Sequence, residues 1–131
     1  MTEAQTALAE LTEISSQIEA AVLFDREGAV AGSTVPDERA GRLVAAARTL
    51  LDAADHVRDA ELTQIEAATG DGSVFVVRDG QRLIAAATGP EPTAGLVFYD
   101  LKSCLRKAAE EPKRKRRTAP KRSGSKSSGS S

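Results

Sequence analysis

The residue types most often used in catalysis are scarce in this chain. There is one histidine, His56, and one cysteine, Cys104. A nucleophile of either type needs a neighbouring base, and a zinc site needs several Cys, His or carboxylate ligands. Neither residue has such companions at a suitable spacing. We expect Cys104 to lie in the core, and His56 to be a solvated residue at a helix end, where the helix dipole favours its charged form.

Carboxylate pairs, serines and glycines give no stronger sign of catalysis. Asp52 and Asp55 fall on the polar side of a predicted helix, which is typical of a solvated face. The serines lack the strand-to-helix turn of a hydrolase nucleophile. No glycine is followed directly by Lys-Ser or Lys-Thr, as it would be in a phosphate-binding loop. The sequence therefore predicts a protein that is not an enzyme and that uses no cofactor, metal or small-molecule substrate.

Charge divides the chain into two parts. All 19 acidic residues and 10 of the 18 Lys and Arg precede Pro112, so residues 1–111 have a net charge of minus nine. Residues 112–131 contain eight basic residues, no acid and no large apolar side chain. Such a segment cannot bury enough surface to offset the entropy of ordering it. We predict one folded domain over 1–111 and a disordered basic tail over 112–131.

The tail could bind an anionic partner. Its basic side chains would neutralise phosphates of a nucleic acid or headgroups of an anionic membrane, in a salt-dependent way. No aromatic residues accompany them, which disfavours base stacking. A solubilising tail and an acidic protein partner stay open. The candidate tail residues are Lys113, Arg114, Lys115, Arg116, Arg117, Lys121 and Arg122.

Signals for export or membrane insertion are missing from the sequence. No stretch approaches the roughly 20 apolar residues that a membrane span needs. The amino terminus shows no basic leader followed by an apolar segment. The single cysteine cannot form an internal disulfide. We therefore expect a cytoplasmic protein.

The first half of the chain predicts two helices and a hairpin. Apolar residues recur at helical spacing over residues 3–18, preceded by a capping-box pattern at Thr2 and Gln5. Two apolar runs flank a turn that contains Gly28, which indicates a β-hairpin. Proline and acidic residues then mark the start of a long helix over 36–57.

The second half predicts three strands and a helix. The run 62–69 is half polar, as in an edge strand, and turns at 71–72 and 79–80 connect it to two apolar runs. These apolar runs have no polar face, so helices should cover both sides of the sheet. Apolar residues at helical spacing follow Thr93 and predict a last helix that ends at Pro112.

These segments resemble the Roadblock/LC7 family in its bacterial form. The resemblance covers residues 3–110 and rests on element order and on the segments AAVLFDREGAVAGS, RLVAAARTLLDAADH, IEAATGDGSVFVVRDGQRLIAAATG and PTAGLVFYDLKSCLRKAAEE. It implies an α/β (α+β) fold of order α-β-β-α-β-β-β-α, with a five-stranded antiparallel sheet between one long helix and a two-helix layer. It also implies dimers paired through the second helices and third strands. The implied role is a non-catalytic adaptor or regulator of a small Ras-like GTPase acting in trans.

The helix over 36–57 has an apolar stripe wider than packing on one sheet face requires. Its alanines would let another backbone approach closely, so we assign part of the stripe and of the third strand to a homodimer interface, with a heterodimer as the alternative. The candidate interface residues are Leu43, Ala46, Leu50, Ala53, Val57, Thr63 and Ile65. The candidate GTPase-contacting residues on the adjoining strip are Arg39, Arg42 and Thr49.

Three other functions remain open. Arg26, Arg39 or Arg42 could act as an arginine finger on a bound GTPase. The chain could instead be a structural dimeric scaffold whose basic tail binds nucleic acid or an anionic membrane. A small-molecule sensor is disfavoured, because three Phe, one Tyr and no Trp leave few groups to line an apolar pocket.

Overall fold

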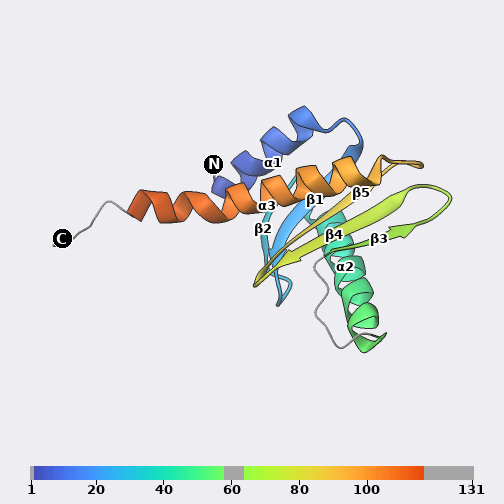
Figure 1. Cartoon of the computed structure of the whole chain (residues 1–131). Helices are drawn as coiled ribbons and strands as arrows, with labels where there is room; N and C mark the ends of the chain where they lie inside the picture. Colours follow the sequence, from blue (N-terminus) through green and yellow to red (C-terminus); the bar gives the residue numbers. More distant parts are fainter. Residues whose placement is uncertain (1, 58–63, 117–131) are drawn as a thin grey trace.

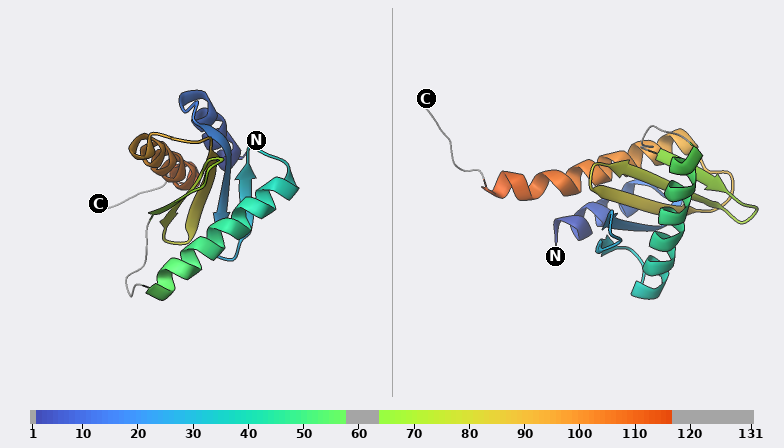
Figure 2. Two further views of the ribbon diagram at one scale, coloured as in Figure 1. Left: turned by 90° about the vertical axis from the view of Figure 1, so that its right-hand side faces the viewer. Right: turned by 90° about the horizontal axis from the view of Figure 1, so that it is seen from below.

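The computed structural model describes residues 2–57 and 64–116. It shows a five-stranded antiparallel sheet with helices on both faces (Figures 1 and 2). The elements are, in chain order, α1 (Glu3–Ile14), β1 (Ile18–Asp25), β2 (Val30–Ser33), α2 (Asp37–Val57), β3 (Gln64–Ala68), β4 (Ser73–Asp79), β5 (Arg82–Thr88) and α3 (Ala94–Arg116). The strand order is β2-β1-β5-β4-β3, with every neighbouring pair antiparallel. The predicted fold class and element order are confirmed.

Each face of the sheet has its own hydrophobic core. On one face α1 and α3 pack side by side, and Phe75 of β4 meets Phe98 of α3 edge to face at a ring-centroid distance of 5.0 Å. On the other face α2 packs against β1, β4 and β5, with Leu51 and Val76 among the buried residues. Because both faces are covered, the central strands contain continuous apolar runs. The prediction of helices on both sides is confirmed.

The first helix is shorter than predicted. The Thr2 hydroxyl accepts a hydrogen bond from the Gln5 amide at 3.1 Å, which caps α1 as the sequence indicated. The helix ends at Ile14, whose side chain is 67% exposed. Ile18 begins β1 and pairs with Thr88 of β5. The helical spacing was misleading here because Ile18, four positions after Ile14, is β-branched and suits a strand as well as a helix. Its pairing in the sheet decides in favour of the strand.

The third strand is an edge strand, as predicted, and its described part spans Gln64–Ala68. The strand had been predicted over 62–69, and its first two residues, which include the interface candidate Thr63, lie outside the described residues.

The last helix continues past the proline at which it was predicted to end. A proline inside a helix removes one backbone donor and crowds the carbonyl four residues earlier, which was the reason for the predicted end. In the structure α3 runs to Arg116 and includes Pro112. The alanine, lysine and arginine residues around the proline all favour helix. The last helix therefore crosses the predicted domain boundary, and residues 117–131 lie outside the described part.

None of the helices in the described part combines the length and the apolar character that crossing a bilayer requires.

Candidate functional site on the long helix

Two apolar rows run along α2. The buried row packs on the sheet and consists of Ala40, Val44, Ala47 and Leu51. The second row, called here the seam row, has alternating spacings of three and four residues and consists of Leu43, Ala46, Leu50, Ala53 and Val57. At 3.6 residues per turn, it lies about 100° around the helix from the buried row. A row with this spacing suits packing against a second helix.

The seam row is only partly covered by the described residues. Leu43 and Leu50 are half-buried, whereas Ala46 and Ala53 are exposed. Val57 at the end of the helix is 78% exposed. The sheet thus accounts for the buried row and leaves most of the seam row open to contact with another molecule.

The sheet edge at β3 supplies the remaining described interface candidate. Ile65 is half-buried and packs against the core beneath α2. β3 pairs with β4 on one side, and no strand among the described residues pairs with its other side. An edge of this kind can accept another strand.

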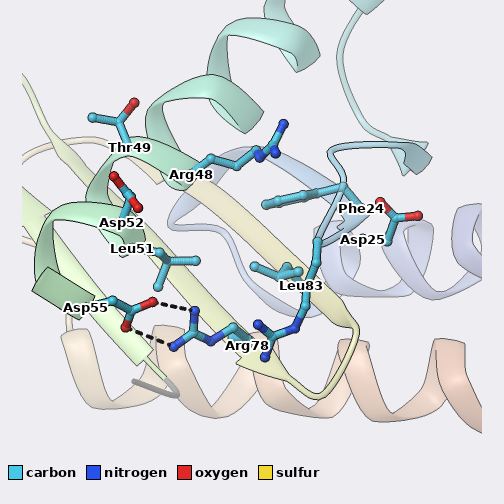
Figure 3. Close-up of a pocket in the computed structure, with 10 residues that line it drawn as sticks. Phe24, Asp25, Arg48, Thr49, Leu51, Asp52, Asp55, Arg78 and Leu83 are labelled. Carbon is cyan, nitrogen blue, oxygen red and sulfur yellow. Dashed lines mark hydrogen bonds and ion pairs between the residues drawn. The ribbon is translucent and has the colours of Figure 1, made fainter. Parts of the chain in front are cut away.

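A polar groove of about 440 Å³ lies on another side of α2 (Figure 3). It is bordered by α2, by the end of β1 with its turn, and by parts of β4 and β5. The lining residues are Phe24, Asp25, Arg26, Arg48, Thr49, Leu51, Asp52, Asp55, Arg78 and Leu83. Three arginines and three aspartates thus surround one depression.

An ion pair crosses the groove from β4 to α2. The two terminal nitrogens of Arg78 donate to the two carboxylate oxygens of Asp55 at 3.2 and 3.3 Å. The Arg78 side chain is 6% exposed and that of Asp55 is 40% exposed. Asp55 is exposed on the helix, as predicted, and its carboxylate is in addition the partner that the buried guanidinium requires.

Sequence reasoning did not identify Arg78, although the period of two in β4 contains a signal for it. Val74, Val76 and Arg78 share one face of the strand, and Val76 is buried beneath α2. A cation on a buried face predicts an acidic partner on the covering helix.

The first hairpin turn forms one end of the groove and is tied to the second hairpin turn. One carboxylate oxygen of Asp25 accepts hydrogen bonds from the amides of Glu27 and Ala29 at 3.0 and 2.9 Å, which closes the first turn. Gly28 in this turn has a φ of +93°. The Nε of Arg26 donates to the carbonyl of Gly80 in the second turn at 2.6 Å. Arg26 therefore links the two turns, which the sequence did not predict.

The three predicted GTPase-contacting residues do not form one cluster. Arg39 and Arg42 are exposed near the start of α2, and Arg42 lies 3.6 Å from Glu38 in a surface ion pair. Thr49 is also exposed but lines the polar groove, which the two arginines do not.

His56 and Cys104 lie where the sequence predicted. The His56 side chain is 76% exposed, and its Nδ1 is 2.7 Å from the Asp52 carbonyl oxygen. This hydrogen bond, followed by the Asp52 carboxylate, raises the pKa of His56. Cys104 is buried, and its burial raises the pKa of the thiol to about 12. Within the described part, no group of three or more His, Cys, Asp or Glu is placed to hold a metal ion.

Four of the seven basic tail candidates lie at the end of α3, which includes residues 113–116. The others, Arg117, Lys121 and Arg122, lie outside the described residues.

Comparison with known proteins identifies the fold. No protein-family model matches the chain, and no curated protein matches its sequence. A Roadblock/LC7 domain from Streptomyces avermitilis is similar in structure, with a TM-score of 0.71 and 17% identity over 85% of this chain and 97% of that one. MglB from Myxococcus xanthus has a TM-score of 0.67 and 14% identity, over 87% and 98% of the two chains. The gliding protein MglB from Thermus thermophilus has a TM-score of 0.63 and 19% identity, over 82% and 87%.

A further structure, described as MglB with a tetrameric arrangement, has a TM-score of 0.60 and 19% identity over 80% and 86% of the two chains. All four similarities cover at least 80% of the present chain. The sheet with one helix on one face and two on the other is therefore shared over nearly the whole described part. This chain has the Roadblock/LC7 fold, as the resemblance in its sequence implied.

Proposed function

We propose that this protein is a dimeric, non-catalytic adaptor or regulator of a small Ras-like GTPase that acts in trans. The main support is the seam row, which gives α2 a second apolar surface that the described residues leave largely open. The fold adds support, because the Roadblock/LC7 resemblance implies dimers and a GTPase partner. MglB proteins share this fold, and one of them has a tetrameric arrangement.

The seam row has the composition that a helix-to-helix contact needs. Burying a fully exposed large aliphatic side chain contributes roughly 1.5–3 kcal/mol to the free energy of association. Val57, which is the most exposed, would therefore contribute most to dimerisation, and the half-buried leucines would contribute less. The alanines at 46 and 53 would allow the two helices to approach closely. The open edge of β3, with Ile65, would add strand pairing to the same interface, and Thr63, which lies outside the described residues, is a further candidate there.

The GTPase would bind to the outer surface of α2. Arg39, Arg42 and Thr49 are exposed there and are our candidate contacts. In this role the chain supplies a surface, and the bound GTPase supplies the nucleotide site.

Light scattering on the full chain tests this function. The mass is measured alone and with each small Ras-like GTPase encoded by the source genome, loaded with GDP or with a non-hydrolysable GTP analogue. We expect twice the chain mass of 13.7 kDa alone, and a further gain with one GTPase in one nucleotide state. A dimer that binds none of them would contradict the GTPase role and favour a structural scaffold, whereas a monomer would contradict the dimer.

A further inference from the structure

Arg48 does not use the partner that its own helix offers. Arg48 and Asp52 are four residues apart on α2, a spacing at which opposite charges can pair. Two other pairs at this spacing are close in the same helix, Glu38–Arg42 at 3.6 Å and Asp52–His56 at 3.9 Å. Within residues 2–57 and 64–116, however, no ion pair is formed by Arg48.

The guanidinium of Arg48 lies instead over the first hairpin turn. Its Nη1 is 2.6 Å from the position that a Cβ on Gly28 would occupy, so a larger residue there would displace the end of the Arg48 side chain. Figure 3 shows the Arg48 side chain reaching toward Phe24 and Asp25, away from Asp52. Arg48 therefore places a cation over the turn at one end of the polar groove, and Asp52 places a carboxylate at the other.

The remaining charges of the groove are engaged within the fold. Asp55 binds Arg78, Asp25 accepts two turn amides, and Arg26 donates to the Gly80 carbonyl. Arg48 and Asp52 are the two groove charges that face solvent, and the exposed Thr49 lies between them in sequence. The Asp52 carboxylate has one ion-pair contact within the described residues, the exposed His56 ring at 3.9 Å.

The position of this pair on α2 leaves it accessible in the proposed dimer. At 3.6 residues per turn, Arg48 and Asp52 lie roughly half a turn around the helix from the seam row. A second copy bound along the seam row would therefore leave the polar groove open.

We propose that the polar groove is the docking site for a segment of the GTPase partner that carries a carboxylate and a cation. The carboxylate pairs with Arg48 and the cation with Asp52. Such charge complementarity orients a partner and speeds its association. The groove volume of about 440 Å³ accommodates a few side chains. This inference rests on the proposed function and moves the main contact from Arg39 and Arg42 to the groove.

Charge reversal at either end of the groove tests the inference. The probe is each small Ras-like GTPase of the source genome, in the GDP and GTP-analogue states, titrated into the full chain by calorimetry at low and at physiological salt. We expect R48E and D52K each to weaken binding about tenfold and to reduce its salt dependence. R48K should weaken binding less than R48E, since lysine keeps the positive charge but lacks the planar guanidinium.

The matched control is R106E, because Arg106 is an exposed arginine on α3, in the other helical layer. The affinity of the R106E variant for the GTPase should stay within about twofold of that of the wild type. Circular dichroism and light scattering report whether each variant keeps its fold and mass, and D52K provides an independent reading if R48E fails to fold.

Three results would overturn the inference. If R39E and R42E weaken binding while R48E and D52K do not, the proposed function stands and the groove is not the site. If R106E weakens binding as much as R48E, the effect comes from net charge and not from the groove. If the wild-type chain binds none of the GTPases, both the proposed function and this inference fall.

Discussion

At the scale of single residues, His56 should titrate above its ordinary range. The Asp52 carbonyl that accepts from its ring, then the Asp52 carboxylate and then that of Asp55, favour the charged form and raise the pKa above 6.5. A group whose folded pKa is raised stabilises the fold below the unfolded pKa, and this contribution disappears as pH rises through the folded pKa. The pH dependence from His56 should therefore begin near pH 6.5 and extend upward.

NMR titration of the imidazole checks this directly, because the chain contains one histidine. We expect a native pKa above 6.5 and a smaller increase in D52N, which keeps the backbone carbonyl but loses the carboxylate charge. A native value at or below 6.5 would contradict the local geometry.

Two glycines should respond in opposite ways to alanine. Gly28 has a φ of +93°, and an added Cβ would meet the Arg48 guanidinium. G28A should therefore lower the free energy of unfolding by roughly 1 kcal/mol or more. Gly41 lies within α2, and a Cβ added there would meet open space. G41A should therefore raise the free energy of unfolding by about 0.5–1 kcal/mol. Urea denaturation followed by circular dichroism measures both, and equal effects would mean that the turn imposes no special backbone requirement.

At the scale of elements, the Arg78–Asp55 ion pair ties the end of α2 to the sheet. D55A removes the carboxylate that binds a buried guanidinium, which costs about 3–5 kcal/mol when both partners are buried. Because Asp55 is 40% exposed, we expect a loss nearer to about 2 kcal/mol.

The control for this prediction is D52A on the same helix, where the carboxylate is 78% exposed. It should cost less than about 0.5 kcal/mol. The double variant R78M/D55L should recover much of the lost stability, since an apolar pair of similar size can replace a buried ion pair. Thermal and urea denaturation compare the variants, and equal losses in D55A and D52A would show that the ion pair does not anchor α2.

At the scale of the whole molecule, the seam row predicts which substitutions prevent dimerisation. L50R places a charge in the middle of the row, where a helix-to-helix contact would bury it without a partner. We expect monomers or insoluble protein. A45R introduces the same charge on an exposed position outside both apolar rows and should leave the mass of the dimer unchanged. Light scattering separates the outcomes, and a dimeric L50R would show that the interface lies elsewhere.

Most of the fold could be predicted from the sequence because the periods of helices and strands are local. The continuous apolar runs around Val76 and Ile84 indicated a sheet covered on both faces, and the two cores confirm it. The predictions failed at element ends, where local preference is weak. Ile18 fits a helix by spacing but pairs with Thr88, and α3 continues through Pro112.

The order of elements and the wide apolar stripe of α2 follow from the sequence alone, since each depends on neighbours a few positions apart, and the scarcity of catalytic residue types follows from composition. The division of that stripe into a buried row and an open seam row, and the polar groove, follow only from the way the chain folds. The contacts of the groove join residues far apart in the chain, with a separation of 23 positions for Asp55 and Arg78 and of 54 for Arg26 and Gly80. Such contacts depend on how the hairpin tips meet α2 across the sheet, and no local pattern specifies that arrangement.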